Sequence, residues 1–239
     1  MTSLSDKSTN EEIRERFDSE VERFSRLETG QKATIDAPLV LELVARTAAA
    51  RLRPNSRILD IGCGAGNFTL RVMQETGPLH CHLVDLSPRM LERAKSRVAE
   101  AGALSVTTCQ TDLRAMEFEE NSFDGILAGA VLHHLRDEED WERVFRRLWH
   151  SLKPGGRLYV SDLIAFDEPA MHAVMWDQYG RYLTSLGGAA YRDTVFAYID
   201  KEDSPRSLPF QVALLKKSGF SSWDVLHKHS VFACYYADK

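Results

Sequence analysis

A short apolar run that ends in an acid leads directly into a glycine-rich turn at residues 57–66. The acid is Asp60, and the glycines at alternate positions are Gly62, Gly64 and Gly66. Residues 68–73 then favour a helix, and a strand, a glycine turn and a helix N-terminus form the nucleoside site of an α/β sheet. Glycine is needed there because a side chain would hold the ligand away from the backbone. Cys63, a small residue inside this turn, is expected to lie beside the same ligand.

The spacing of these glycines separates two kinds of nucleoside site. The dinucleotide fingerprint G-x-G-x-x-G needs its third small residue at position 67, which is Asn67 here. The turn therefore fits the pattern G-x-G-x-G better than the dinucleotide fingerprint. A further acid, Asp85, ends the next predicted strand roughly 20 residues beyond the turn, where a carboxylate can accept hydrogen bonds from both ribose hydroxyls. The alternative role for Asp85 is an acid that caps the helix starting at Pro88.

Together with three later segments, this turn resembles motif I of the class I S-adenosylmethionine (SAM) dependent methyltransferases. The later segments are Thr111-Asp112-Leu113, the stretch from Ala128 to Leu135, and Lys153-Pro154-Gly155-Gly156. The resemblance implies that Asp112 binds the adenine amino group and that the backbone of Leu113 contacts the ring. It also implies that the small residues Ala128 and Gly129 let the sulfonium come close, and that residues 153–156 form a turn before the fifth strand.

The same resemblance suggests roles for the remaining candidate residues. Asp60 is expected to orient the loop and the ammonium group of the cofactor, and Leu86 to contact the cofactor next to Asp85. A histidine after the fourth strand often lies beside cofactor or substrate in this family, so His133 is a candidate catalytic residue. His133 and His134 could instead be structural histidines with satisfied hydrogen bonds. Asp162, at the end of the fifth predicted strand, is a candidate base, needed only where the acceptor loses a proton.

Alternating strand and helix patterns predict the fold that carries these residues. Strands are predicted at 57–61, 80–85, 105–110, 123–128 and 157–162, with helices between them. Such alternation is typical of a parallel, doubly wound α/β sheet. The resemblance implies the Rossmann-like methyltransferase layout, in which a mostly parallel seven-stranded sheet ends in an antiparallel hairpin, predicted here at 220–227 and 230–236.

The chain divides into four predicted parts. These are an N-terminal helical lid at 1–52, a SAM-binding core at 53–165, a helical insertion at 166–209 for substrate or oligomer contacts, and a closing helix and hairpin at 210–239. In the lid, Thr9 and Glu12 fit a capping box, and apolar residues recur at helical spacing from Ile13 to Leu27, until Thr29 to Gln31 break the helix. A second helix is expected to start between Asp36 and Pro38.

The bulk composition restricts the partners and the compartment. A net charge of −5 argues against a broad nucleic-acid surface, so nucleic acid is an unlikely partner. The basic stripe is expected to be a solvated face; it comprises Arg143, Arg146, Arg147 and Lys153. No apolar run approaches the ~20 residues of a membrane helix, and residues 1–10 lack a signal-peptide core. The four cysteines are scattered, so we expect no metal site and a cytoplasmic protein.

The sequence therefore predicts an enzyme that transfers a methyl group from SAM, its cofactor, to a small-molecule acceptor. The insertion is rich in Tyr, Trp and Arg, which suit a pocket for an aromatic or anionic acceptor but equally a homodimer surface. The alternative is carboxy-SAM synthesis, because the N-terminal helices, residues 158–162 and the tail resemble carboxy-SAM synthase. That family places an arginine on the helix before Gly219-Phe220, whereas residues 211–217 contain none. A SAM-binding module without turnover is the third hypothesis.

Overall fold

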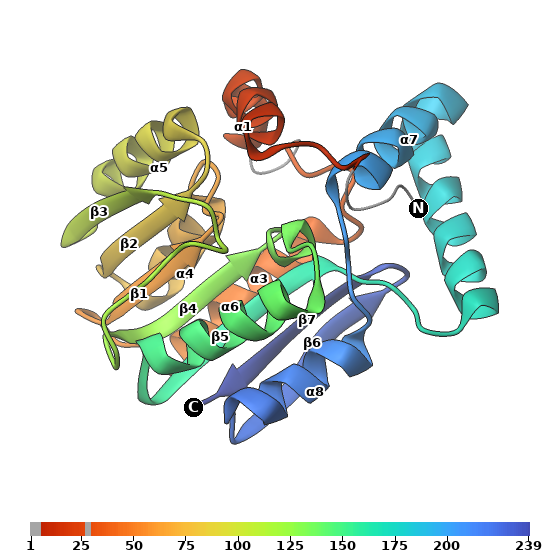
Figure 1. The fold of residues 1–239 in the computed structure, drawn as a ribbon. Coiled ribbons are helices and arrows are strands. Elements are labelled where there is room, and N and C mark those ends of the chain that lie inside the picture. Colours follow the sequence, from red (N-terminus) through yellow and green to blue (C-terminus); the bar gives the residue numbers. More distant parts are fainter. Residues whose placement is uncertain (1–5, 27–29) are drawn as a thin grey trace.

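The computed structural model describes residues 6–26 and 30–239, which form a seven-stranded sheet with helices on both faces (Figure 1). The strands are β1 (Arg57–Ile61), β2 (His80–Asp85), β3 (Ser105–Gln110), β4 (Phe123–Gly129), β5 (Leu152–Leu163), β6 (Ser222–His229) and β7 (Phe232–Asp238). Their order in the sheet is β3-β2-β1-β4-β5-β7-β6. The first five strands are parallel, and β7 pairs antiparallel with both β5 and β6. The predicted doubly wound, mostly parallel sheet is therefore confirmed.

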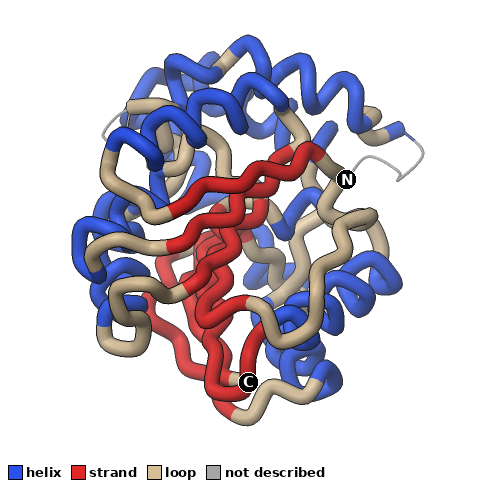
Figure 2. The backbone as a smooth tube through the Cα atoms, turned by 90° about the vertical axis from the view of Figure 1, so that its left-hand side faces the viewer, coloured by secondary structure: helices blue, strands red, loops and turns tan. Residues whose placement is uncertain are grey.

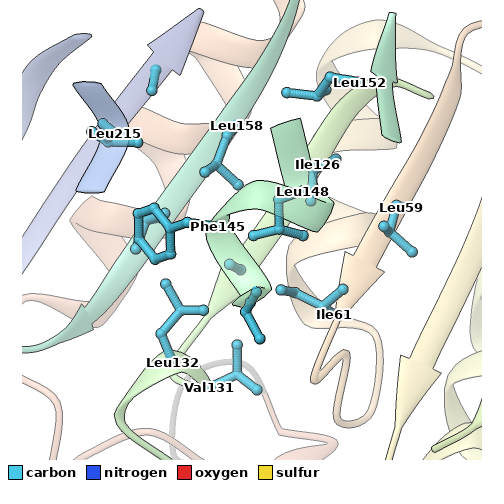
Figure 3. Packing of buried hydrophobic residues seen from close by; sticks show 14 of the residues in the cluster. Leu59, Ile61, Ile126, Val131, Leu132, Phe145, Leu148, Leu152, Leu158 and Leu215 are labelled. Atoms are coloured by element: carbon cyan, nitrogen blue, oxygen red, sulfur yellow. The ribbon is translucent and has the colours of Figure 1, made fainter. Parts of the chain in front are cut away.

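Two helical layers cover the sheet, as the turned view in Figure 2 shows. One face packs against α6 (Glu138–Ser151) and α8 (Leu208–Ser218), and the other against α3 (Ala37–Ala49), α4 (Asn67–Thr76) and α5 (Pro88–Glu100). The core between the sheet and α6 and α8 is built from buried hydrophobic residues (Figure 3); it includes Leu59, Ile61, Ile126, Leu158, Phe145, Leu148 and Leu215. Because both faces of the central strands are covered, β1 and β4 are mostly buried, whereas the edge strand β3 is largely exposed.

The N-terminal segment forms α1 (Asn10–Ser19) and α2 (Val21–Phe24), and α1 lies on the same side of the sheet as the long insertion (Figure 1). The predicted capping box is confirmed, since Thr9 and Glu12 exchange side-chain and backbone hydrogen bonds. The prediction of one continuous helix was wrong. The backbone amide of Glu20 donates to the carbonyl of Phe17 at 3.0 Å, and this short turn interrupts the helical hydrogen-bond pattern. The predicted helical position Leu27 and the break at Thr29 lie outside the described residues.

The insertion after β5 is helical, as predicted, and consists of α7 (Pro169–Glu202). Gly187 and Gly188 leave helical geometry and fold α7 into a hairpin of two helices; Gly188 has φ of +78°. This hairpin has a core of its own, built from Tyr179, Leu183, Val195 and Ile199, which contacts Leu163 and Val231 of the sheet region. The hairpin is therefore anchored to the sheet at the end of β5.

Two boundaries differ from prediction for local reasons. Residues 153–156 lie within β5 rather than in a turn before it, because Leu152 already pairs with Phe123 and the intervening residues form an irregularity in the ladder. The hairpin strands begin two residues later than predicted. Ser230 adopts φ of +51° and forms the turn with Val231, so His229 pairs with Phe232.

The predicted solvated stripe on α6 and β5 carries ion pairs. Arg143 pairs with Asp140, Arg147 lies 3.3 Å from a Glu117 oxygen, and Lys153 lies 2.8 Å from an Asp124 oxygen. Within residues 6–26 and 30–239, no helix combines the length and apolarity needed to cross a bilayer.

Candidate active site

A large cavity lies where β1, β2 and β4 end, beneath α1, and it encloses about 1090 Å³ including its mouth. The predicted cofactor residues that line it are Asp60, Gly62, Cys63, Gly64, Asp85, Leu86, Asp112, Leu113 and Gly129. Two predicted residues lie behind the wall instead. Gly66 faces α5, where an added Cβ would meet Ala94 and Val98, and Ala128 is buried in the sheet core. Parallel strands thus bring most of the predicted residues to one edge.

The glycine turn has a backbone that only glycine adopts without strain. Gly62, Gly64 and Gly66 all have positive φ, of +61°, +50° and +84°. A Cβ at Gly62 would lie 2.3 Å from Val131, whereas a Cβ at Gly64 would meet nothing within 4 Å. Gly64 therefore presents bare backbone to open space in the cavity. A cradle of this kind lets an extended ligand approach the main chain closely.

Asp85 joins the glycine turn to the start of α5. Its carboxylate accepts hydrogen bonds from the Gly64 amide at 2.8 Å and from the Ser87 amide at 2.9 Å. Desolvation raises the pKa of Asp85, and these two amides oppose that rise. The side chain of Ser87, rather than Asp85, caps α5 by accepting from the Met90 amide at 3.1 Å. Asp85 thus fixes the shape of the turn from below, and its predicted contact with a ribose stays a prediction.

Asp60 is almost fully enclosed beside the turn. It is 2% exposed and accepts a hydrogen bond from the Thr69 hydroxyl at 2.7 Å. Burial raises the pKa of Asp60 to about 7, against the opposing effect of the Thr69 contacts. Burial also raises the pKa of the Cys63 thiol, so Cys63 is a neutral wall residue rather than a thiolate. A cationic group of a ligand would favour the ionised form of Asp60.

Asp112 connects the cavity to the N-terminal lid. Its carboxylate accepts from the Arg114 guanidinium and from the Asn10 side chain of α1. Burial would raise the pKa of Asp112, but these contacts, with Arg114 foremost, hold it below its usual range. Neither Asn10 nor Arg114 was predicted as a site residue. Asn10 reaches the cavity only because α1 docks over the carboxyl edge of the sheet, whereas Arg114 contacts Asp112 from two residues further along the same loop.

This donor set fits the expected SAM cofactor. The bare backbone at Gly64 leaves room for the methionine part, Asp60 is placed for its ammonium, and Asp85 and Asp112 offer carboxylate oxygens for hydroxyl and amino donors. These roles are the ones that the sequence predicted, and they stay predictions.

A second cavity adjoins the first and reaches the end of β5 and the α7 hairpin. The two cavities share a wall made of Phe17, Phe24, Gln31, Phe68, Ala130 and His134. Ala130 has φ of +53°, an unusual conformation for a residue with a Cβ, which often marks a functional site. Both predicted catalytic residues, His133 and Asp162, line the second cavity rather than the first.

His133 belongs to a short 3-10 helix, η2 (Leu132–His134), which follows β4. Its Nδ1 pairs with the Asp162 carboxylate, and that carboxylate also accepts from the amides of Leu132 at 2.6 Å and Leu163 at 2.7 Å. Desolvation disfavours the imidazolium, but Asp162 and Asp203 outweigh it and raise the pKa of His133 to about 9. The structure therefore brings the two predicted catalytic residues together as a buried histidine–carboxylate pair.

The remaining wall of the second cavity is mainly apolar. It comprises Phe17, Phe24, Ala33, Ala37, Val40, Leu163, Tyr179, Tyr198, Ile199 and Phe232. Its two arginines already have acidic partners: Arg16 pairs with Glu202 and Glu20, and Arg23 with Glu20. Of the aromatic residues, Phe17 and Phe24 lie on the predicted helical stripe of the lid, which gave no sign that they would face a ligand.

Among the described residues there are two groups of three side chains of metal-binding type. In each group the possible ligand atoms lie within 4.8 Å of one another. They are Asp36 with His227 and His229, and Asp203 with His133 and His134. In the first, both imidazoles hydrogen-bond to the same Asp36 oxygen, at 2.9 and 2.8 Å. In the second, ion pairing between imidazole and carboxylate accounts for the close approach. We assign no metal to either group.

Comparison with known proteins agrees with this geometry. A family model described as a methyltransferase domain matches residues 58–156, which include the glycine turn, Asp85, Asp112 and His133. Demethylmenaquinone methyltransferase from Listeria monocytogenes is 28% identical over 175 residues, which is 72% of each chain. Phosphoethanolamine N-methyltransferase 2 from Caenorhabditis elegans is 36% identical over 109 residues, 46% of this chain and 24% of that protein. Residues 58–156 therefore form a methyltransferase domain.

Solved structures extend the similarity to the whole fold of this methyltransferase. Haemonchus contortus phosphoethanolamine N-methyltransferase 2, in complex with SAM, aligns with a TM-score of 0.62 at 23% identity, over 91% of this chain and 46% of that one. The [4+2]-cyclase SpnF aligns with a TM-score of 0.66 at 17% identity, over 98% of this chain and 97% of that one. The methyltransferase-domain match supports SAM as the cofactor, while fold similarity alone leaves the acceptor to be argued from the site.

Asp85→Ala should weaken SAM binding by about 100-fold or more, because it removes a buried carboxylate whose charged hydrogen bonds each contribute about 1.5–3 kcal/mol. Isothermal titration with SAM measures this. Asp224→Ala, at an exposed position of β6, is the matched control and should bind normally. Unchanged affinity in a folded Asp85→Ala protein would contradict the predicted role.

Asp60→Asn should change the pH dependence of stability in the cofactor-free protein. The pKa of Asp60 is about 7 when folded against ~3.9 when unfolded, so its stabilising protonation is complete below pH ~4 and is lost as the pH rises through 7. Asn does not titrate. From pH 5 to 8, wild type should therefore lose about 2 kcal/mol of unfolding free energy relative to the variant. Urea unfolding at both pH values tests this, and parallel curves would refute it.

Proposed function

We propose that this methyltransferase transfers the methyl group of SAM to a small, mainly apolar, ring-bearing acceptor whose hydroxyl group or activated carbon loses a proton. The observation that carries the proposal is the wall shared by the two cavities. A methyl group held at Ala130 and His134 would have the cofactor cavity on one side and the second cavity on the other. The acceptor belongs in the second cavity, with its reacting atom toward His133 and His134.

The lining of the second cavity supports an apolar acceptor. Aromatic and aliphatic side chains form most of it, and they suit a flat ring better than a strongly hydrated group. An acceptor with a phosphate, such as the one in the name of the Caenorhabditis relative, would need free cations. Arg16 and Arg23 are occupied by Glu20 and Glu202, so the quinone in the name of the Listeria relative is the better guide to acceptor class.

The chemistry follows from charge balance. The sulfonium supplies an activated methyl group, and transfer to a neutral hydroxyl or carbon acid releases one proton for each methyl transferred. His133 lies beside the expected transfer point, and Asp162 fixes its ring through Nδ1, which leaves Nε2 to accept that proton. The aromatic walls and the lid exclude water from the reacting atoms. His133 is thus the general base and Asp162 its orienting partner.

Carboxy-SAM synthesis is the alternative to be separated by experiment. Residue 211, on the helix where that family places an arginine, is a buried Gln whose Oε1 accepts from the Tyr235 hydroxyl at 2.7 Å. Mass spectrometry of molecules released from purified, undialysed protein should find SAM or S-adenosylhomocysteine. A nucleoside heavier by one carboxyl group would instead establish the alternative.

The lid, the insertion and the assembly remain part of the proposal. Residues 1–52 act as a lid, 53–165 as the SAM-binding core, 166–209 as the acceptor wall, and 210–239 as the closing part of the core. Four free cysteines support a reducing, cytoplasmic setting. The exposed apolar residues Met171 and Val174 on α7 support a homodimer, which size-exclusion chromatography with light scattering tests.

The test of the reaction uses reduced 1,4-naphthoquinone as the ring-bearing acceptor and follows S-adenosylhomocysteine release. The rate constant kcat/KM should rise with pH and level off near pH 9, because His133 has a pKa of about 9 and acts only when neutral. His133→Gln should lower kcat about 10²- to 10⁴-fold and abolish the rise of kcat/KM that levels off near pH 9.

His80→Gln is the matched control, since His80 lies at the opposite end of β2 and hydrogen-bonds Ser105. It should leave the rate and the pH profile unchanged. Turnover of phosphoethanolamine but of no ring-bearing acceptor would contradict the proposed class, and full activity of His133→Gln would contradict the proposed base.

A further inference from the structure

A second carboxylate faces the other side of His133. Asp203, the first residue beyond α7, is 5% exposed and lines the second cavity. Its Oδ1 lies 3.7 Å from His133 Nε2 and 3.2 Å from His134 Nδ1, and this buried oxygen has no well-aligned hydrogen-bond donor among the described residues. His133 therefore has a carboxylate near each ring nitrogen, Asp162 at Nδ1 and Asp203 at Nε2.

The position of Asp203 is fixed by several independent contacts. The amide of Ser204 donates to the His133 carbonyl at 2.7 Å, so the chain after α7 is attached directly to η2. Arg16 of α1 donates to both oxygens of Glu202, at 2.8 and 3.0 Å. The amide of Ser8 also donates to the Lys201 carbonyl at 2.9 Å. Lid and insertion thus meet at the residue next to Asp203.

We propose that Asp203 is a positioning residue that controls the orientation and charge of His133, and that the docked lid and insertion thereby complete the catalytic base. The proposal rests on the function proposed above, in which His133 accepts the acceptor's proton. It assigns a role to the end of the insertion beyond forming a wall: the insertion supplies one of the two carboxylates of the base.

The charges that face His133 come from four elements. Asp162 lies on β5, Asp203 after α7, Arg16 on α1, and His134 on the same 3-10 helix. Arg16 is itself neutralised by Glu202 and Glu20. The two carboxylates therefore dominate, and together they raise the pKa of His133 against the effect of burial. Removal of Asp203 should lower that pKa and free Nε2 to turn away from the transfer point.

The first test is an NMR titration of ¹³C,¹⁵N-histidine-labelled protein, with the His133 signal assigned by its loss in His133→Gln. Asp203→Asn should lower the His133 midpoint by about one pH unit, a tenfold loss of proton affinity. Asp193→Asn is the matched control. It removes a carboxylate from the same insertion, one that is exposed and pairs with Arg192 rather than with either histidine, and it should leave the midpoint within a few tenths of a unit of wild type.

The second readout is the pH profile of turnover with reduced naphthoquinone. In Asp203→Asn the plateau of kcat/KM should be reached at a lower pH, with a lower maximum and with SAM affinity unchanged. An unmoved midpoint in Asp203→Asn, or an equal shift in Asp193→Asn, overturns the proposal. Because the NMR titration needs no acceptor, a shifted midpoint without turnover would count against the proposed function and not against the role of Asp203.

Two further outcomes would also overturn the proposed role of Asp203. Asp203→Ser is made in parallel, and if both Asp203 variants lost cooperative unfolding while Asp193→Asn kept it, Asp203 would be a folding requirement rather than a positioning residue. Metal analysis of the same samples tests the second outcome, in which Asp203 binds a metal ion. A stoichiometric divalent cation in wild type that is absent from Asp203→Asn would make Asp203 a metal ligand.

Discussion

The structure depends on buried aspartates that reach the same edge of a parallel sheet. Asp60, Asp85 and Asp162 come from β1, β2 and β5; Asp60 and Asp162 are buried, and Asp85 is half-buried. A buried carboxylate is costly unless it is protonated, hydrogen-bonded or paired. Each carboxylate has a different partner. Asp60 accepts from the Thr69 hydroxyl, Asp85 from the amides of Gly64 and Ser87, and Asp162 pairs with the imidazole of His133. These hydrogen bonds fix the loops that form the two cavities.

The same requirement extends to segments far away in the sequence. Asp112 is satisfied by Asn10 of α1, and His133 is flanked by Asp203 beyond α7. The carbonyl of Phe24 also accepts from Asn67, the first residue of α4, at 2.8 Å. The lid and the insertion are thus hydrogen-bonding partners of the sheet edge rather than loose covers. Opening the lid would remove the Asn10 contact from Asp112 and the Arg16 contact from Glu202.

The sequence predicted the core of the fold well because local patterns determine it. The bounds of β1, β2 and β3 were confirmed to the residue, although only β1 is a continuous covered apolar run and the edge strand β3 is largely exposed. The cofactor cavity followed from the residues at strand ends. The hairpin was misplaced by two residues because the left-handed conformation of Ser230 leaves no clear signal. Asp203 could not be predicted as a site residue, since its role arises only when α7 folds back and docks on η2.

A shared fold does not by itself select a reaction, as the similarity to a [4+2]-cyclase shows. Methyl transfer needs a donor and an acceptor in line, with water excluded between them. In this chain the two cavities meet at Ala130 and His134, and apolar side chains form most of the wall on the acceptor side. A cyclisation would need neither a proton acceptor at that junction nor the carboxylate that orients it. The His133–Asp162 pair, which lines the second cavity, is therefore the feature that favours the proposed methylation of an acceptor that must lose a proton.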